Sequence, residues 1–342
     1  MFGTLRLLLA CLVALSHLVG SADVAHFGFY AVRGFFVLSG FLLTAALNEV
    51  YGFDAGRFWT NRLLRILPPY YVVCVLTFVA ICLARTDAAE FLKFWQPDPR
   101  PNDLLANLAV LPLQFTEARF RLVPPAWSIA VELVLYVVLW AVIARREAWA
   151  WLGLVAGIAY HTACLYDGFA WGAVYFTAPS ALLSFSLGAL VYFWRRTGWL
   201  QVGPRAVLPS LAAWLGNMVA GGSILPDSYV LGHGYYLGTI LFSILVAGLA
   251  GWAPGARLRA VDRALGDLAY PVFLVHWLAG FLVALAFLPG TWRGWELAAA
   301  ASPAILAFAT VLALLTRRYV EPLRSRLRGA PSASLSGALG PA

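Results

Sequence analysis

The stretch TLRLLLACLVALSHLVG, residues 4–20, decides the class of fold. It is mostly apolar, and its only charged or basic side chains are Arg6 and His17. Its length approaches the roughly 20 residues that a helix needs to cross the hydrocarbon core of a membrane. Comparable apolar runs recur along the rest of the chain. The sequence therefore predicts a protein that crosses the membrane many times.

Composition supports the same class. Of the 342 residues, 62% are hydrophobic and only 12% are charged, whereas a soluble domain carries about 25% charged residues. The mean hydropathy is +0.79. A surface this poor in charge is typical of a chain whose main solvent is lipid, so a soluble globular protein is excluded.

The charge balance is basic, with 24 lysines and arginines against 16 acidic residues and a net charge of +8. All the basic residues except Lys93 are arginines, and they stand in short clusters between apolar runs. A nucleic-acid-binding protein gathers its positive charge on a soluble face. Loops of a membrane protein show the pattern seen here, so we expect membrane lipid as a partner and no nucleic acid.

The apolar runs predict an all-α membrane protein, a bundle of about ten transmembrane helices. The expected spans are 4–20, 27–47, 66–84, 124–144, 147–166, 172–194, 206–222, 231–252, 267–288 and 297–317. The long connection 85–123 is expected to hold a short amphipathic helix around 102–114. We expect one transmembrane domain over residues 1–328 and a disordered cytoplasmic tail over 329–342.

The arginines predict the topology. If the N-terminus is cytoplasmic, the inside segments carry 17 basic residues, and the short outside segments carry only Arg33 and Arg293. Five further basic residues lie in the long outside connection. This asymmetry follows the positive-inside rule and predicts both termini in the cytoplasm. The alternative is a cleaved signal peptide, but His17 interrupts its apolar region, and cleavage would reverse the alternation of all later spans.

The cysteines point to no special chemistry. They lie within or at the edges of apolar runs, without spacings typical of a metal site or of a disulfide framework. We expect them to be free thiols that pack as small apolar residues, and we expect no bound metal. They are Cys11, Cys74, Cys82 and Cys164.

Ionisable groups at membrane depth are costly and mark candidate functional sites. Arg6 and His17 are eleven residues apart in the first span, which is close to three helical turns. Both side chains should therefore project from one face, about 16 Å apart along the helix axis.

Further polar residues interrupt the later spans. Each has a purely structural interpretation: arginine anchors at the membrane surface, small-residue helix packing, a buried salt bridge or a hydrogen-bonded histidine. None is decisive alone. They are Ser39-Gly40, Arg62 and Arg65, Ser128 with Glu132 one turn later, and Tyr270 with His276.

Their expected depths form a pattern. Arg6, Arg62 and Arg65 lie at the inner boundary, where a cluster of guanidinium groups suits phosphate. If the fourth span starts at the outer surface, Glu132 lies about two turns below it, at the depth of His17. A histidine beside a carboxylate suits proton transfer. The pattern predicts a reaction site that extends across the membrane.

The same residues resemble the acyltransferase-3 family of integral membrane O-acyltransferases over essentially the whole chain. Two departures occur: Ala269 stands where the family often has serine, and Arg33 stands where an acidic residue is common. The matching motifs are Arg6 and His17 with ten residues between them, Phe35-Phe36-Val37-Leu38-Ser39-Gly40-Phe41, Arg62-x-x-Arg65, Trp127-Ser128-x-x-x-Glu132, Leu265-Gly266-x-x-Ala269-Tyr270 with His276, and Tyr319-Val320-Glu321-Pro322.

The resemblance implies a ten-helix enzyme that takes an acyl group, usually acetyl, from cytoplasmic acyl-CoA. The acceptor would be a hydroxyl of a glycan or glycoconjugate. No cofactor would be bound permanently, because acyl-CoA is the donor substrate. The protein would be a multi-pass protein of the plasma membrane, the inner membrane of a bacterium.

The resemblance also implies roles for individual residues. His17 and Glu132 would be catalytic, and whether His17 acts as a general base or carries the acyl group is open. The residues expected to bind the donor are Arg6, Arg62 and Arg65. The residues expected to contact substrate or to support the site are Ser39, Ser128, Tyr270 and His276.

A transporter is the main alternative. Intramembrane histidine and glutamate side chains with arginine clusters also suit a proton-coupled carrier of a small anion or sugar. The ten expected spans show no inverted repeat, which disfavours it. A third alternative is a di-haem electron carrier with His17 and His276 as axial ligands. It is disfavoured, because it would need two facing histidines for each haem.

Overall fold

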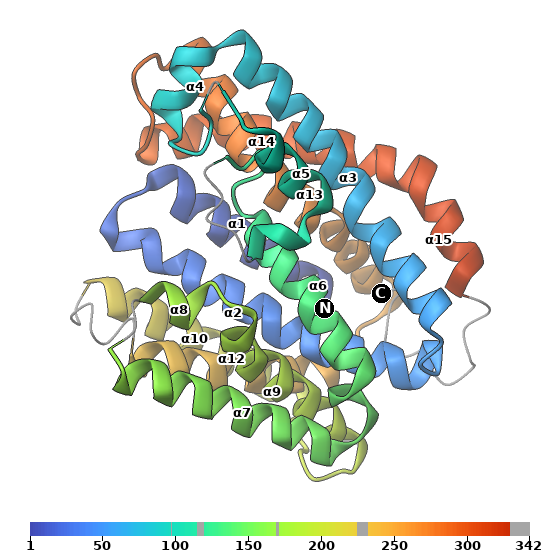
Figure 1. Cartoon of the computed structure of the whole chain (residues 1–342). Coiled ribbons are helices and arrows are strands. Elements are labelled where there is room, and N and C mark those ends of the chain that lie inside the picture. Colours follow the sequence, from blue (N-terminus) through green and yellow to red (C-terminus); the bar gives the residue numbers. More distant parts are fainter. Residues whose placement is uncertain (97, 115–119, 169–170, 224–231, 329–342) are drawn as a thin grey trace.

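Helices make up nearly all of the computed structural model (Figure 1), which describes residues 1–96, 98–114, 120–168, 171–223 and 232–328. No strand occurs in these ranges, so the prediction of an all-α fold is confirmed. The tail predicted over 329–342 lies outside the described residues. The helices in chain order are α1 (Phe2–Val19), α2 (Ala22–Ala46), α3 (Ala55–Leu83), α4 (Arg85–Phe91), α5 (Pro101–Ala109), α6 (Ala126–Ala141), α7 (Glu147–Tyr166), α8 (Trp171–Tyr175), α9 (Ala178–Arg196), α10 (Val207–Ser223), α12 (His233–Ala250), α13 (Ala256–Phe287), α14 (Trp295–Leu315) and α15 (Glu321–Arg328).

Short helical turns join several of these elements. Two are π-helical, η1 (Leu47–Tyr51) after α2 and η5 (Thr316–Val320) between α14 and α15. Three are 3-10 helices, η2 (Leu111–Gln114), η3 (Ile143–Arg145) and η4 (Pro204–Ala206). The expected amphipathic helix around 102–114 is present as α5 followed by η2.

Each of the ten predicted spans contains a helix. Within the described residues, eight helical segments are long and apolar enough to cross a membrane. The other two predicted spans correspond to α6, with 16 residues, and α10, with 17 residues. The chain is therefore a multi-pass membrane protein.

Two helices begin well before their predicted spans. The span predicted at 66–84 belongs to α3, which begins at Ala55, and the span predicted at 267–288 belongs to α13, which begins at Ala256. Asp54 caps α3, because its Oδ1 accepts a hydrogen bond of 2.8 Å from the backbone N–H of Arg57. The apolar pattern located only the apolar part of each helix, whereas the backbone stays helical through the polar turns before it.

The helices form two groups with α1 and α2 between them (Figure 1). On one side, α1 packs against α13 and α14, and α3 and α15 complete this group. On the other side, α2 packs against α9, α10 and α12, and α7 covers α9. The two groups therefore meet at a seam where α1 packs against α2.

Close backbone approaches hold α1 and α2 to the other helices of their own groups. Gly3 of α1 and Gly266 of α13 touch without side chains, and a Cβ on Gly3 would collide with the backbone of Asp262. A Cβ on Gly40 of α2 would collide with the backbone of Phe185 in α9. The small-residue packing predicted as one interpretation of Ser39-Gly40 therefore holds for Gly40.

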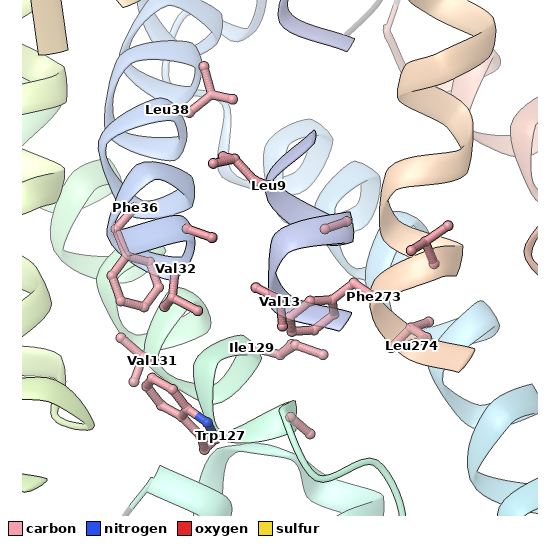
Figure 2. Packing of buried hydrophobic residues seen from close by; sticks show 14 of the residues in the cluster. Leu9, Val13, Val32, Phe36, Leu38, Trp127, Ile129, Val131, Phe273 and Leu274 are labelled. Carbon is pink, nitrogen blue, oxygen red and sulfur yellow. The ribbon is translucent and has the colours of Figure 1, made fainter. Parts of the chain in front are cut away.

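An apolar core lies where α1, α2, α6 and α13 converge (Figure 2). The labelled residues from these helices are buried. They include Leu9 and Val13 of α1, Val32, Phe36 and Leu38 of α2, Trp127, Ile129 and Val131 of α6, and Phe273 and Leu274 of α13.

One end of the bundle collects segments that were predicted to lie inside. The Asn48 side chain after α2 donates to the backbone oxygen of Ala144 over 2.8 Å. Asp262 in α13 accepts from the backbone N–H of Thr4 in α1 over 2.8 Å. Segments far apart in sequence thus meet at one end, as the alternation of ten spans requires. The side of the membrane on which this end lies stays a prediction.

Candidate active site

The start of α1 is hydrogen-bonded to a carboxylate of α13, far away in sequence. Asp262 accepts hydrogen bonds from the N–H of Gly3 over 3.1 Å, and from the N–H and the hydroxyl of Thr4 over 2.8 Å each. No side chain at Met1 caps this helix, so Asp262 acts as its cap. The contact also fixes Arg6, whose charge is partly offset by Asp262 and Asp267.

Arg6, Arg62 and Arg65 line one cavity at this end of the bundle. Arg62 is 5% exposed, and its Nε and Nη2 atoms have no hydrogen-bond partner in the part of the chain that the structure describes. No ion pair with a carboxylate is formed by any of the three arginines among the described residues. Clustered guanidinium groups without a carboxylate partner attract a multivalent anion, and phosphate is the group that their planar geometry fits.

The cavity is narrow, with a volume of about 130 Å³. Sites that enclose a drug-sized ligand are typically about 300–1,000 Å³, so this one fits a slim chain and not a nucleotide. It runs from the arginines towards an apolar end. Its polar lining also includes Ser39, Ser128, Glu132, Tyr136 and Tyr270, and its apolar lining includes Val32, Phe35, Phe36, Ile129 and Phe273.

Glu132 faces this cavity from α6. Its Oε1 accepts a hydrogen bond of 3.2 Å from the Ser39 hydroxyl, and its Oε2 accepts one of 2.8 Å from the Tyr136 hydroxyl. Arg62 and Arg65 are close enough to act on its charge. The carboxylate therefore belongs to the arginine end.

The expected depth of Glu132 beside His17 was wrong. In the antiparallel pair α1 and α2, Gly28 lies against Ser16 and Gly34 lies against Leu9. Ser39, the partner of Glu132, is therefore level with the first turns of α1 and not with His17. The prediction places the start of the fourth span at the membrane surface. In the structure, α6 begins at Ala126, inside the protein, and the residues just before it are also buried.

Two of the expected supporting residues make backbone contacts in the cavity wall. The Tyr270 hydroxyl donates to the backbone oxygen of Ile66 over 3.0 Å and so joins α13 to α3 just beyond Arg65. The Ser128 hydroxyl donates to the backbone oxygen of Pro125 over 3.0 Å at the start of α6. Each oxygen keeps lone pairs that can accept a hydrogen bond from a ligand.

His17 and His276 form a pair at the opposite end of α1. The distance between Nδ1 of His17 and Nε2 of His276 is 2.9 Å, and the rings stack with an angle of 13° between them. The Nδ1 of His276 lies 3.3 Å from the backbone oxygen of Val272. That oxygen can only accept, so Nδ1 of His276 is the donor.

The chain of hydrogen bonds assigns the tautomers. When His276 is neutral and donates from Nδ1, its Nε2 is an acceptor and must receive the proton of His17 Nδ1. A neutral His17 then has its free lone pair on Nε2. No hydrogen bond to this atom is found among the described residues. The arrangement therefore prepares Nε2 of His17 to accept a proton.

Trp277 and Arg293 complete the surroundings of His17. The indole of Trp277 lies 5.2 Å from the His17 ring, between ring centroids. The Arg293 guanidinium lies 4.7 Å from the centroid of Trp277 and 4.8 Å from that of Phe91. Its Nη2 donates to the backbone oxygen of Phe91 over 2.9 Å. Burial lowers the pKa of Arg293 to about 10, which leaves it cationic at neutral pH.

The cavity and the histidine pair approach each other without joining. Neither His17 nor His276 lines the cavity, whereas Phe35 and Phe273 do. The ring of Phe273 lies 6.3 Å from that of Phe35 and 6.3 Å from that of His276. Phe273 therefore links the lining of the cavity to the histidine pair.

Several residues at the two ends were missed by the reasoning from sequence. Arg324 of α15 is 7% exposed, pairs with Glu321 at 2.6 Å, and is close enough to Arg62 and Arg65 to act on them electrostatically. It thus joins the arginine cluster. Its position three residues after Glu321 of the C-terminal motif was a usable signal. Nothing in the sequence distinguished Trp277, and Arg293 was counted only as an outside charge.

Arg33 is a further correction. It was counted in a short outside segment, but it lies inside α2 and is 2% exposed. Its guanidinium donates to the backbone oxygens of Ser180 over 2.9 Å and Val174 over 2.7 Å, and it lies over the ring of Tyr235. Because these groups replace water around the charge, it needs no position at the membrane surface.

Comparisons with known proteins agree with these motifs. A family model described as an acyltransferase domain matches residues 3–317. Acyltransferase MdmB of Streptomyces mycarofaciens is 27% identical over an alignment of 345 residues, which covers 91% of this chain and 85% of that protein. The putative peptidoglycan O-acetyltransferase YrhL of Bacillus subtilis (strain 168) is 41% identical over 63 residues, 17% of this chain and 10% of that protein. No solved structure matches.

The family match includes both ends of the site, from Arg6 and His17 in α1 to His276 in α13. The helical fold, with its membrane-length segments, agrees with the architecture that the motifs implied. The chain therefore belongs to the acyltransferase-3 family and is an integral membrane O-acyltransferase.

Proposed function

We propose that this enzyme transfers an acetyl group from cytoplasmic acetyl-CoA to a hydroxyl of a glycan or glycoconjugate, in the plasma (inner) membrane of a bacterium. One relative is named as a putative peptidoglycan O-acetyltransferase, which supports a glycan acceptor. The observation that carries the proposal is the division of the site into two ends. Arg6, which lines the cavity, and His17, whose Nε2 is free, lie eleven residues apart on α1, about 16 Å along the helix axis.

The donor enters at the arginine end. Arg6, Arg62 and Arg65 bind its phosphates, and Arg324 contributes a fourth guanidinium from α15. Because the cavity is too narrow for a nucleotide, the nucleotide stays at the mouth and only the pantetheine arm enters. The apolar end of the cavity then directs the thioester towards His17.

Glu132 acts at the donor end in this proposal. Its carboxylate, held by Ser39 and Tyr136, balances part of the arginine charge while the donor is absent. This role replaces that of a second catalytic carboxylate beside His17.

His17 acts as the general base. The acceptor oxygen attacks the thioester carbon while its proton moves to Nε2 of His17. The electron pair of the carbonyl moves to its oxygen and returns when the carbon–sulfur bond breaks. The CoA thiolate leaves and takes the proton from His17, which restores the base. His276 keeps the Nδ1 proton of His17 in place throughout.

The test uses the purified protein in nanodiscs with [14C]acetyl-CoA and an envelope glycan fraction. We expect base-labile label in the glycan and release of one CoA thiol for each acetyl transferred. His17→Ala should lower the rate by about 10²- to 10⁴-fold and leave acetyl-CoA binding intact. A wild-type protein that moves a small anion or sugar across sealed vesicles, and transfers no label, would be a transporter instead.

A further inference from the structure

Trp277 carries a buried polar atom that no described residue satisfies. Its side chain is 7% exposed, and its Nε1 has no hydrogen-bond partner among the described residues. Other indoles have one: Nε1 of Trp95 donates to the backbone oxygen of Arg121 over 2.9 Å, and Nε1 of Trp140 donates to that of Phe53 over 3.0 Å. A buried donor without a partner destabilises the protein, so its retention calls for a reason.

The position of Trp277 supplies that reason. Its ring centroid is 5.2 Å from that of His17 and 6.0 Å from that of His276. Trp171 also has an unpaired buried Nε1, but it packs on Tyr175 and Tyr235 and has no ring contact with either histidine. The Trp277 ring therefore lies directly beside the ring that would accept the proton.

Arg293 strengthens the indole as a donor. Its guanidinium carbon lies 4.7 Å from the centroid of the Trp277 ring, within the range of a cation–π contact. A cation over an indole draws electron density from the ring and makes the N–H a better donor. Two groups thus lie side by side: the His17 imidazole, which can accept a proton, and the Trp277 indole, which carries a polarised donor.

We infer that Trp277 is a catalytic residue whose Nε1–H donates a hydrogen bond to the carbonyl oxygen of the acyl group. The inference rests on the proposed function. As the acceptor oxygen attacks the carbon, the carbonyl electron pair moves to this oxygen and its negative charge is stabilised by the indole. When the electron pair re-forms the double bond and the thiolate leaves, the hydrogen bond weakens again. No proton passes through Trp277.

A purely structural tryptophan makes a different prediction. Trp277→Phe keeps an aromatic ring beside His17 and removes only the unpaired N–H and part of the ring. If the residue serves packing alone, this change leaves turnover nearly unaltered. If Nε1 acts on the acyl oxygen, turnover falls while thermal stability is kept or raised, because the unsatisfied buried donor has gone.

The experiment compares Trp277→Phe with the matched control Trp95→Phe. Rates of [14C]acetyl transfer from acetyl-CoA into base-labile esters of the envelope glycan fraction are measured in nanodiscs, with acetyl-CoA binding and thermal unfolding in parallel. We expect Trp277→Phe to lose about 10²- to 10³-fold in kcat with acetyl-CoA binding unchanged. Trp95→Phe breaks a hydrogen bond that is made, so it should lower the unfolding temperature and keep the rate.

A second variant guards against loss of packing. Benzothienylalanine at position 277, introduced by suppression of a stop codon, keeps the fused-ring shape and replaces N–H by sulfur. It should be as impaired as Trp277→Phe. Near-normal kcat in either variant overturns the inference, as does a loss of rate that is matched by a loss of acetyl-CoA binding. If His17→Ala is inactive while both Trp277 variants are normal, the proposed function stands and only this inference fails.

Discussion

Nδ1 of His17 and Nε2 of His276 lie 2.9 Å apart, although 259 residues of sequence separate them. The contact joins the first helix of the protein to α13. It fixes both the orientation and the tautomer of the histidine that is expected to accept the proton.

This pairing predicts a graded response at position 276. His276→Phe removes the acceptor, so His17 can turn or change tautomer, and kcat should fall by about 10²-fold or more. His276→Gln offers an amide oxygen in place of Nε2 and should retain more activity. Acetyl transfer by the two variants, with the KM for acetyl-CoA as a control, decides the matter. Equal rates for His276→Phe and the wild type would remove His276 from the mechanism.

The arginine end predicts that variants of the donor-binding arginines change the KM for acetyl-CoA, whereas a control variant does not. Arg65→Ala and Arg324→Gln should each raise the KM for acetyl-CoA by about 10- to 100-fold with a smaller change in kcat. Arg65→Lys should rescue only partly, because lysine lacks the planar fork that grips phosphate. The exposed Arg326 lies on the same helix as Arg324, so Arg326→Gln should behave as the wild type.

Acetyl-pantetheine, which lacks the nucleotide and its phosphates, sharpens this test. Its KM should be high with the wild type and unchanged by Arg324→Gln. An equal effect of Arg324→Gln on acetyl-CoA and acetyl-pantetheine would mean that Arg324 supports the fold and does not bind phosphate.

Glu132 should affect the donor. Glu132→Gln removes one negative charge from the arginine cavity, so free CoA should bind about two- to tenfold more tightly. Calorimetry on the purified variant measures this, and Ser39→Ala, which removes only one of the two hydroxyl donors to Glu132, provides a milder comparison. An unchanged Kd for CoA would contradict the placement of Glu132 among the donor groups.

The cap at the start of α1 predicts a loss of stability. Asp262→Ala removes the acceptor of three hydrogen bonds from Gly3 and Thr4, and should cost about 1–2 kcal/mol, seen as a lower unfolding temperature in detergent. Asp267→Ala is the matched control, since Asp267 is exposed on the same helix. If both variants unfold at the same temperature, the contact with Asp262 does not stabilise α1.

The topology can be tested by labelling single cysteines in a background without the native cysteines. Residues placed at Arg146, Arg196 and Arg259 should react from the cytoplasmic side, and one at Asp167 from the opposite side. Labels at positions 146 and 196 on different sides would contradict the bundle of ten spans.

Much of the fold was predictable because the lipid imposes it. A helix that crosses the membrane needs a long apolar run whatever its neighbours are, so each of the ten runs contains a helix. The arginine cluster was predictable for a related reason. Arg6, Arg62 and Arg65 belong to segments that must lie at the same boundary.

The rest depended on tertiary structure. The predicted depth of Glu132 depends on a helix that starts at the membrane surface. In the structure, the residues before Ala126 are buried, so this helix starts inside the protein. Arg33 is stabilised by backbone oxygens of α8 and α9, which no local pattern reveals. Whether an indole N–H such as that of Trp277 finds a partner is likewise settled only by packing.

The cap that Asp262 provides to α1 has a consequence for biosynthesis. The leading N–H groups of α1 are satisfied by a residue of α13, a helix that is made long after α1. The nascent protein therefore has neither a fixed Arg6 nor a paired His17 until α13 is inserted. On the proposed function, we therefore expect a chain that lacks α13 to be unable to consume the acyl donor.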